Sequence, residues 1–451
     1  MAREIVVGTA EHYNWVNIAA AINHPEAGKK LDISADTNNI IGISDASVLL
    51  YPCNGYATPE LLRQIINIEK PDALMLFTDP RYFVHIFQME NEIRKKMPIL
   101  YLNIWDDYPA PIYNKSFYEA CDLLMAISKQ THNINKLVLG NKAEGKVLTY
   151  VPHGINEKQF FPISEFMKDD FTKLEEKKTK LFGKDIPEFV VFYNARNIRR
   201  KCTADLIAGY SQFCDKIGKA AAKKCALLLH TQPVDENGTD LNAVVDLLCD
   251  PEYQRVVFSN ERLGVSDMNV LYNIGDVTAL VSSNEGWGLS LTEAMMAGKM
   301  IIATVTGGMQ DQMRFEDKKG NWYTPTKEVP SNHFGTYKKH GEWARPLFPT
   351  NMSLVGSVPT PYIFDDRADF RDIAAAIEEV YLLDPKDRKA KGIKAREWVT
   401  SDEAMMSANN MCKNVVSSVD ETFKTWKPKP NFELVKFERI PRKKLLHPLV
   451  Y

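Results

Sequence analysis

Short apolar runs alternate with helix-like amphipathic stretches over the first third of the chain. The pattern predicts a strand at Glu4–Val7, a helix over Trp15–Ile22 and a longer helical stretch over Phe83–Lys96. Three further apolar runs have the length of buried strands: Ala73–Phe77, Ile99–Leu102 and Leu123–Ile127. Strands that alternate with helices are typical of βαβ units, so we expect a parallel sheet here.

The same alternation returns after a polar segment. The stretch Phe161–Glu188 is charged and rich in lysine, which predicts a linker carrying one exposed amphipathic helix. A second series of strand-like runs follows: Phe189–Tyr193, Ala226–Leu229, Val256–Phe258, Val277–Val281 and Met300–Thr304. The chain has 451 residues, more than one hydrophobic core usually supports. We therefore predict an α/β protein of two Rossmann-like domains that face each other across a cleft.

The last third breaks the regular alternation. Residues 313–363 form a loop-rich insertion with many aromatic residues and prolines, a length that is uncommon in a loop without a function. Helical patterns return at Phe370–Leu383 and Asp402–Phe423, and the tail from Lys424 is rich in proline and lysine. We divide the chain into domains at 1–165 and 189–400, a linker at 166–188, and a C-terminal helix with a basic tail at 401–451.

Composition narrows the setting of the protein. The formal net charge is −2, which gives no overall attraction to nucleic acid or to anionic membranes. Its seven cysteines form no C-x-x-C pair, which argues against a disulfide framework and a cysteine zinc site. No signal-peptide pattern starts the chain and no apolar run reaches the ~20 residues of a membrane span, so we expect a cytoplasmic protein. Basic clusters at Arg199–Lys201 and Arg439–Lys444 are typical of solvated faces, and the second is the one hint toward nucleic acid.

The segment Ser282–Gly298, SSNEGWGLSLTEAMMAG, carries the clearest chemical pattern. It predicts a strand end, a tight turn, and a helix that begins at Leu289–Ser290, whose free N–H groups could hold a diphosphate. Glu285 in the turn and Glu293 in the helix could accept hydrogen bonds from sugar hydroxyls. Two plainer readings stay open: Ser290-x-x-Glu293 fits a capping box, and Glu285 fits a solvated turn residue. Trp287, between two glycines, is expected to pack.

Four ordered motifs between Val151 and Gly308 resemble family 4 of the retaining glycosyltransferases. Glu285-x7-Glu293, with Gly286-Trp287-Gly288 between, is similar to that family's Glu-x7-Glu signature, and Gly307-Gly308 follows at the family's distance. Val151–Asn156 with Phe161-Pro162 resembles its interdomain turn. Asn194-Ala195-Arg196 with Lys201-Cys202 resembles its G-R…K-G segment, where Ala195 and Cys202 replace two glycines.

The resemblance implies a GT-B fold, whose C-terminal helices return to the N-terminal domain, and a function. It implies transfer of a hexosyl or pentosyl unit, with retention, from a nucleotide-diphosphate sugar to a hydroxyl acceptor. Glu285 would face the sugar, while Arg196 and Lys201 would hold the diphosphate, although they could be a surface-exposed pair. The residues expected at the donor are Glu293, Gly286, Trp287, Gly288, Leu289, Gly307 and Gly308. No cofactor is expected, and protein cations would take the place of a metal, in keeping with the absence of Asp-x-Asp.

The acceptor would lie against the domain at 1–165. Three residues that follow predicted elements are candidates there: Asp79, His12 and Asp106. Each could instead be a helix cap or a satisfied polar group, and Pro80 makes the cap reading strongest for Asp79. The acceptor itself stays open between a glycan, a small molecule and a hydroxymethylated DNA base of a viral system.

Three other functions remain possible from the sequence: a nucleotide-sugar epimerase, a glycosyl phosphorylase, and a non-catalytic nucleotide-sugar-binding protein. The sequence does not indicate the oligomeric state. No G-x-G-x-x-G or P-loop motif follows a strand, so dinucleotide and P-loop functions lose their main support.

Overall fold

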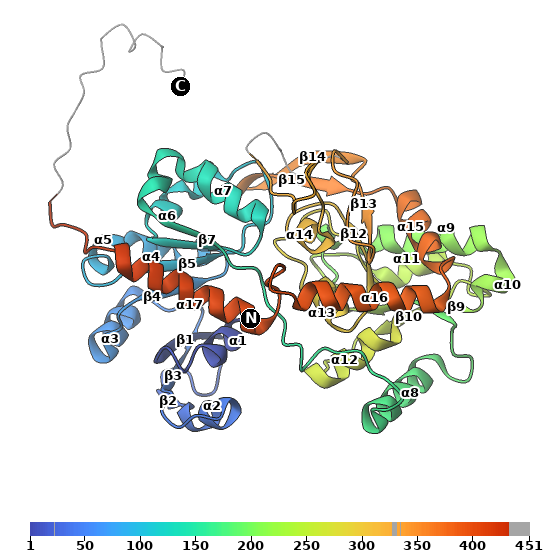
Figure 1. Cartoon of the computed structure of the whole chain (residues 1–451), viewed down its shortest axis with the longest axis horizontal. Coiled ribbons are helices and arrows are strands. Elements are labelled where there is room, and N and C mark those ends of the chain that lie inside the picture. Colours follow the sequence, from blue (N-terminus) through green and yellow to red (C-terminus); the bar gives the residue numbers. More distant parts are fainter. Residues whose placement is uncertain (22, 327–331, 334, 433–451) are drawn as a thin grey trace, which may run out of the picture.

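Parallel strands form the centre of each of two lobes that lie side by side (Figure 1). The computed structural model describes residues 1–432 except residue 22, residues 327–331 and residue 334. The prediction of two α/β domains is confirmed.

The N-terminal lobe contains two sheets. One is parallel with the order β4-β5-β6-β7, formed by β4 (Leu74–Phe77), β5 (Ile99–Asn103), β6 (Leu123–Ala126) and β7 (Val147–Tyr150). The other has the order β1-β3-β2, formed by β1 (Trp15–Ala21), β3 (Val48–Asn54) and β2 (Leu31–Asp32). The helices of this lobe are α1 (Ala2–Gly8), α2 (Ser34–Ile41), α3 (Pro59–Glu69), α4 (Val84–Gln88), α5 (Glu90–Ile93), α6 (Lys115–Glu119) and α7 (Lys129–Leu139).

The first two predicted elements are wrong in type. The predicted strand Glu4–Val7 lies within the helix α1, and the predicted helix Trp15–Ile22 is the strand β1, with Ile22 outside the described residues. The segment Trp15–Ala21 is a strand because every one of its residues pairs in parallel with a residue of β3. The stretch Phe83–Lys96 is helical as predicted, but it forms two short helices, α4 and α5.

The C-terminal lobe has one parallel sheet of six strands with the order β10-β9-β8-β11-β12-β13. Its strands are β8 (Phe189–Asn194), β9 (Cys225–His230), β10 (Val256–Ser259), β11 (Val277–Leu280), β12 (Met300–Thr304) and β13 (Ala344–Leu347). The first five were predicted from their apolar runs. This order reverses direction between β8 and β11, and ligands of such sheets bind beyond the carboxyl ends of the strands at that point.

Helices cover this sheet on both faces. They are α9 (Thr203–Ile217), α10 (Lys219–Ala222), α11 (Leu241–Leu248), α12 (Val265–Ile274), α13 (Leu289–Met296), α14 (Met309–Met313), α15 (Phe370–Tyr381) and α16 (Pro385–Thr400). The segment expected to be a linker contains α8 (Lys168–Phe182), as its amphipathic pattern predicts. Two of its side chains, Leu174 and Phe182, are buried in the core of this lobe, so α8 packs onto the lobe.

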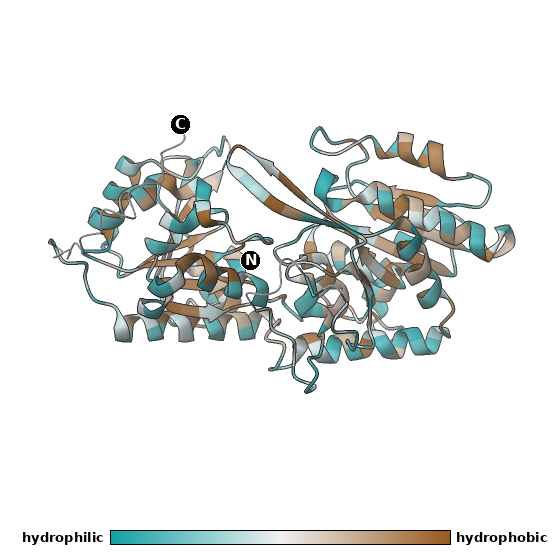
Figure 2. Ribbon diagram, turned by 90° about the horizontal axis from the view of Figure 1, so that it is seen from above, coloured by the Kyte–Doolittle hydropathy of each residue, from teal (hydrophilic) through white to brown (hydrophobic). Residues whose placement is uncertain are grey.

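The insertion at 313–363 includes β13 and most of an antiparallel hairpin, although residues 327–331 and 334 lie outside the described residues. The hairpin consists of β14 (Asn351–Ser357) and β15 (Thr360–Arg367). Figure 2 shows this ribbon extending from the C-terminal lobe toward the N-terminal lobe. The segment that the sequence suggests to be mostly loop thus reaches across the space between the lobes.

The last described helix, α17 (Ala408–Thr425), returns to the N-terminal lobe, which confirms the expectation for the C-terminal helices. The returning chain is held where the outgoing chain leaves, since Ile155 N–H donates to Met406 O (3.0 Å) and Ala408 N–H donates to Ile155 O (3.0 Å). Farther along, Ser418 Oγ and Thr149 Oγ1 are hydrogen-bonded at 2.9 Å. The chain therefore passes between the lobes twice.

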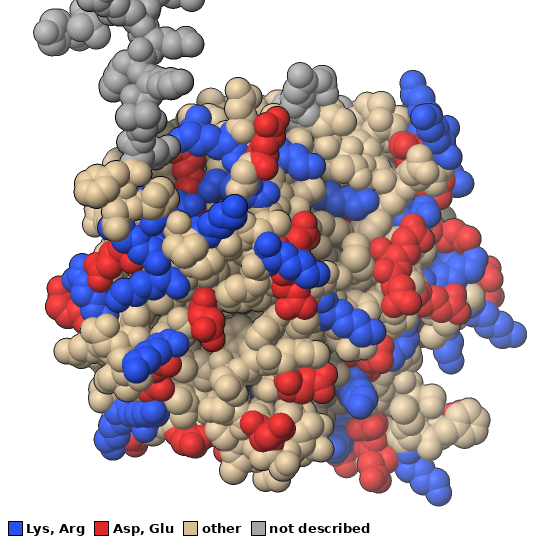
Figure 3. All heavy atoms as spheres, turned by 60° about the vertical axis from the view of Figure 1, so that its left-hand side comes forward, with Lys and Arg blue, Asp and Glu red and all other residues tan. Residues whose placement is uncertain are grey.

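Charge is mixed on the surface of the molecule. Figure 3 shows Lys and Arg interspersed with Asp and Glu over one face, in keeping with a net charge near zero. The basic cluster Arg439–Lys444 lies outside the described residues. Among the helices that the structure describes, none combines the length and apolar character that crossing a membrane requires.

Candidate functional site

The loop after β8 and the turn after β11 meet at the point where the sheet order reverses. Lys201 Nζ donates to Glu285 Oε1, and Arg200 Nη1 lies 3.1 Å from Glu285 Oε2. Ser282 Oγ donates to the same carboxylate at 3.1 Å. Glu285 is buried, whereas the side chain of Arg200 is 35% exposed. The site therefore contains two cations that converge on one carboxylate, and one cation remains open to solvent.

The electrostatics of this cluster favour ionised groups. Burial alone would raise the pKa of Glu285, but Lys201 and Arg200 outweigh it and lower that pKa to about 2. Burial alone would likewise lower the pKa of Arg200, and the charges of Glu285 and Asp106 raise it. Glu285 and Arg200 therefore hold each other charged.

Asp106 brings a second carboxylate to the site from the N-terminal lobe. It follows β5, and burial raises its pKa, while Arg200 lowers that pKa and Glu285 raises it. The two lobes are close here: a Cβ atom added at Gly286 would lie 2.6 Å from Ile104 O and 3.1 Å from Asp106 Oδ1. The site is therefore built at the junction of both lobes.

The loop after β12 packs against the turn that carries Glu285. Gly308 N–H donates to Glu285 O at 3.0 Å. Gly307 has φ +50, and a Cβ atom there would lie 1.8 Å from Glu285 O. No other residue type could take this place without moving the turn. At Gly308, an added Cβ atom would lie 2.3 Å from Gly286 O.

Glu293 forms a different contact from the capping box that its spacing allows. The N-cap of α13 is Gly288, with φ +85 and no side-chain cap, so Ser290 already lies inside the helix. Instead, Tyr272 OH donates to Glu293 Oε2, and Asn194 Nδ2 donates to Tyr272 OH at 2.8 Å. Burial raises the pKa of Glu293 to about 7, against the opposing effect of the Tyr272 hydrogen bond. The capping-box reading is wrong, because the helix begins one residue before Ser290.

Two other predicted donor residues lie at the start of α13. Trp287 is buried, its Nε1 donates to Thr292 Oγ1 at 2.9 Å, and its ring is 6.4 Å from that of His153. It packs, as its place between glycines predicts. Leu289 is the first residue of the helix and is 37% exposed.

Arg196 is not part of the cluster. Its side chain is 63% exposed and pairs with Asp235 at 2.7 Å. The arginine beside Glu285 is Arg200, and a role for Arg196 at the donor diphosphate stays a prediction. The signal for Arg200 was present in the Arg199–Lys201 cluster, but a basic run looks the same when it is solvated.

The other two acceptor-side candidates have local partners. Asp79 accepts from Arg81 N–H at 2.9 Å as the N-cap of a short helix and also pairs with the Arg81 guanidinium. His12 is exposed and lies 3.2 Å from Glu11. Of the three candidates, the structure brings only Asp106 to Glu285.

One of the two residues that replace a glycine of the resembled family has a left-handed backbone. Cys202, which stands where the resembled family has glycine, has φ +51. Among the residues that the structure describes, no three His, Cys, Asp or Glu side chains gather as a metal site.

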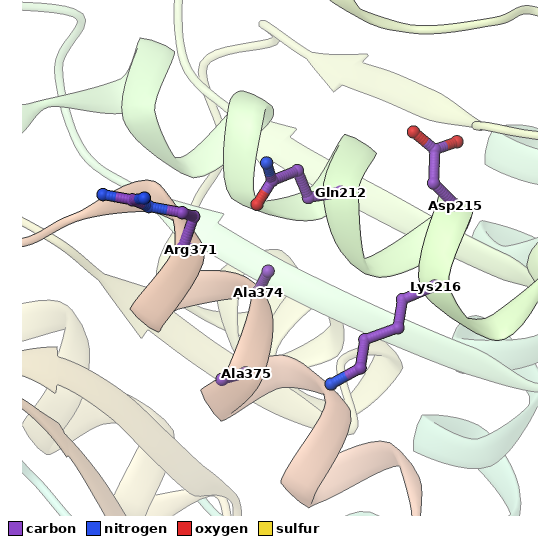
Figure 4. Close-up of a pocket in the computed structure, with 6 residues that line it drawn as sticks. All are labelled: Gln212, Asp215, Lys216, Arg371, Ala374 and Ala375. Atoms are coloured by element: carbon purple, nitrogen blue, oxygen red, sulfur yellow. The ribbon is translucent and has the colours of Figure 1, made fainter.

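A hollow of about 540 Å³ lies elsewhere, between α9 and α15 (Figure 4). Its charged side chains have partners of their own: Lys216 pairs with Glu378, Arg371 pairs with Asp369, and Asp215 accepts from Tyr253 OH at 2.6 Å. The charged side chains of this hollow therefore form separate pairs, whereas those of the other site converge on Glu285.

Comparison with known proteins bears on the fold and on one segment of the chain. Residues 254–329, which include the segment from Glu285 to Gly308, match the family model described as glycosyl transferases group 1. Sucrose-phosphate synthase from Thermosynechococcus elongatus superposes with a TM-score of 0.61 at 16% identity, covering 94% of this chain and 92% of its own. This chain has the GT-B fold.

Further GT-B structures superpose over similar lengths. HepE from Anabaena in complex with UDP-glucose has a TM-score of 0.59 at 14% identity, covering 93% of this chain and 94% of its own. The α,α-trehalose 6-phosphate synthase from Burkholderia multivorans has a TM-score of 0.59 at 10% identity, with the same coverage of 93% and 94%. No curated protein matches this chain in sequence. In the GT-B fold of this chain, the cluster around Glu285 lies where the two lobes meet.

Proposed function

We propose that this protein is a glycosyltransferase that moves a sugar from a nucleotide-diphosphate donor to a hydroxyl acceptor. The observation that carries the proposal is the convergence of Lys201 and Arg200 on Glu285 at the junction of the lobes. The family match over residues 254–329 includes this acidic segment and supports the same activity. HepE is described in complex with UDP-glucose, so UDP-glucose is the first donor to test.

The donor diphosphate would take the place of the Glu285 carboxylate at Lys201 and Arg200. Two fixed cations would stabilise the charge that develops as the diphosphate leaves, which is electrostatic stabilisation of the transition state. The freed Glu285 would face the sugar, and Glu293 would accept from the ribose hydroxyls. Retention at the anomeric carbon and independence of metal are part of this proposal, and the resemblance to family 4 supports both.

Asp106 would orient the acceptor hydroxyl. It comes from the N-terminal lobe, and the charges of Arg200 and Glu285 both act on its carboxylate. A carboxylate is a strong hydrogen-bond acceptor for a hydroxyl group. The class of acceptor, with a hydroxymethylated DNA base among the candidates, stays a prediction.

A panel of nucleotide sugars tests the proposal, starting with UDP-glucose and each acceptor class in turn. Release of nucleotide diphosphate that requires an acceptor is expected, together with a new glycoside. Lys201→Ala is expected to abolish most of this release, and Lys184→Ala, which changes an exposed lysine after α8, is the matched control. Binding without turnover would indicate a non-catalytic protein, and turnover without an acceptor product would indicate an epimerase.

A further inference from the structure

The hairpin β14–β15 contacts both lobes although it forms a two-stranded sheet apart from the sheets of either lobe. An isolated two-stranded ribbon is marginally stable in water, so its contacts must hold it in place. Its outer side chains contribute little, since Leu354 is 62% exposed and Val358 is 99% exposed. The inner strand, β15, forms the contacts that follow.

Toward the C-terminal lobe, β15 holds the turn that leads into Glu285. Asp365 Oδ1 accepts from both Ser283 Oγ and Asn284 Nδ2 at 2.9 Å. The next residue, Asp366, donates its N–H to Ser283 O at 2.8 Å. Ser283 and Asn284 are both buried, so the hairpin holds a part of the turn that water does not reach freely.

The same turn holds Arg200. Ser283 N–H donates to Arg200 O at 2.8 Å, and Arg200 Nη1 donates to Asn284 O at 2.7 Å. One carboxylate oxygen of Asp365 therefore fixes the two residues that in turn fix a cation of the site. Glu285 follows directly in the chain.

Toward the N-terminal lobe, β15 makes hydrogen bonds through three of its residues. The Tyr362 hydroxyl accepts from Ile112 N–H at 3.3 Å and donates to Ala110 O at 3.4 Å. Phe364 N–H donates to Tyr108 O at 2.8 Å, and Tyr113 OH donates to Tyr362 O at 3.1 Å. Near the tip, Arg81 Nη1 donates to Thr360 Oγ1 at 2.6 Å. Tyr108 lies two residues after Asp106, so one strand joins the Asp106 loop to the Glu285 turn.

We propose that Asp365 is a positioning residue that fixes Glu285 and Arg200, and that its hold depends on the contacts of β15 with the N-terminal lobe. The hairpin thereby makes the geometry of the site depend on the relative position of the lobes. This inference rests on the proposed function for its catalytic meaning, whereas the structural coupling itself can be measured without any ligand.

Amide hydrogen exchange of the full-length protein tests the coupling, with peptides that cover residues 282–288. Loss of two hydrogen bonds to a carboxylate in Asp365→Ala should speed exchange there by about tenfold or more. Asp365→Asn keeps an oxygen acceptor and should restore most of the protection. Ser353→Ala is the matched control, because Ser353 is the exposed partner of Asp365 across the hairpin.

A second variant tests dependence on the other lobe. Thr360→Val combined with Tyr113→Phe removes two bonds between β15 and the N-terminal lobe, far from the turn in sequence. Faster exchange at residues 282–288 supports the coupling, and unchanged exchange overturns it. Unchanged exchange in Asp365→Ala, or equal acceleration throughout the six-stranded sheet, overturns the positioning role.

UDP release from UDP-glucose, measured in the presence of each acceptor class in turn, gives the catalytic readout. Asp365→Ala should lower the rate by about tenfold, and Asp365→Asn should recover most of it, because a residue that orients charged groups acts through geometry. A rate that stays at the wild-type level in Asp365→Ala overturns the catalytic meaning of the contact. If the wild-type protein releases no UDP, the proposed function fails for that donor, while the exchange result still decides the coupling.

Discussion

Glu285 holds Lys201 and Arg200 in the structure, so in the proposed function a donor diphosphate would compete with a carboxylate for the same two cations. The two cations would attract the diphosphate more strongly than Glu285, since a diphosphate carries more negative charge than one carboxylate. Release of Glu285 from the cations would also remove the effect that lowers its pKa. The residue would then be free to accept from a sugar hydroxyl.

The first prediction separates the three cations near this site. Lys201→Ala and Arg200→Ala should each lower kcat/KM for transfer by roughly 10²–10³-fold, the range for loss of one preorganised donor. Arg196→Ala should stay near the wild-type value, because its exposed side chain pairs with Asp235. Steady-state kinetics measures all three. A large loss in Arg196→Ala would show that this arginine leaves Asp235 when donor binds.

The second prediction concerns Glu293. Glu293→Gln should weaken donor binding by about tenfold or more, since glutamine keeps one acceptor oxygen where the ribose needs two. Because burial raises the pKa of Glu293 to about 7, affinity in the wild type should fall as the pH drops from 8 to 6, and this dependence should vanish in the variant. Calorimetric titration with UDP-glucose checks both effects, with Tyr272→Phe as the control for the lost tyrosine hydrogen bond. Equal affinity in wild type and Glu293→Gln would leave Glu293 without a role at the donor.

Sequence reasoning placed Glu285 and Lys201 at one donor site through the family resemblance, but it put Asp106 on the acceptor side without relating it to them. Glu285 and Lys201 follow neighbouring strands of the C-terminal sheet, whose carboxyl ends meet at one edge. Asp106 follows β5 of the other lobe and reaches them because the two lobes are in contact there. Sequence reasoning chose Arg196 and passed over Arg200, since the path of the intervening loop decides which arginine turns inward. The role of Asp365 gave no local signal, because its partners lie more than 80 residues away.

At the scale of elements, predictability follows the strength of the local pattern. The buried strands of the C-terminal sheet carry uninterrupted apolar runs, and all five predicted ones are present. At the N-terminus, where a predicted helix is a strand, the local pattern favours the wrong type of element. The segment at Trp15–Ala21 contains three alanines, good helix formers, and only pairing with β3 makes it a strand.

The third prediction concerns the contact between α14 and the N-terminal lobe. Asp311 Oδ2 accepts from Lys129 N–H at 2.8 Å and from Tyr150 OH at 3.1 Å. Burial raises the pKa of Asp311 to about 6, while Lys129 and Tyr150 oppose the rise. Because the folded state binds the Asp311 proton more tightly than the unfolded state does, the raised pKa stabilises the folded protein below about pH 4. This stabilisation is lost as the pH rises through about 6.

Asp311→Asn keeps the oxygen acceptor and removes the titration. The Tm of this variant should therefore rise relative to wild type between pH 4 and pH 6.5, by the equivalent of about 2–3 kcal/mol of stability. Thermal unfolding across this range measures the difference. Asp246→Asn, at an exposed position in α11, should show no such trend. A constant difference at every pH would contradict a shifted pKa at Asp311.

At the scale of the whole molecule, donor binding at the junction should stabilise both lobes together. Ligand at 100 times its Kd adds about 2.7 kcal/mol to the stability of a protein that binds it only when folded. UDP-glucose should therefore raise the Tm, and EDTA should leave this rise unchanged because Lys201 and Arg200 supply the positive charge. Loss of transfer in EDTA, with recovery on adding manganese, would contradict independence of metal.

The return of α17 to the N-terminal lobe affects the order in which the protein can be completed on the ribosome. The last strand of the C-terminal sheet ends at Leu347, whereas the face of α1, β6 and β7 is covered only after Thr425 has been made. Met411, Val415 and Val419 of α17 are buried in that contact. Although synthesis starts at the N-terminus, the first lobe is finished last. Nascent chains that stop before α17 should expose an apolar surface on the first lobe, and chaperones are expected to bind there until the final helix docks.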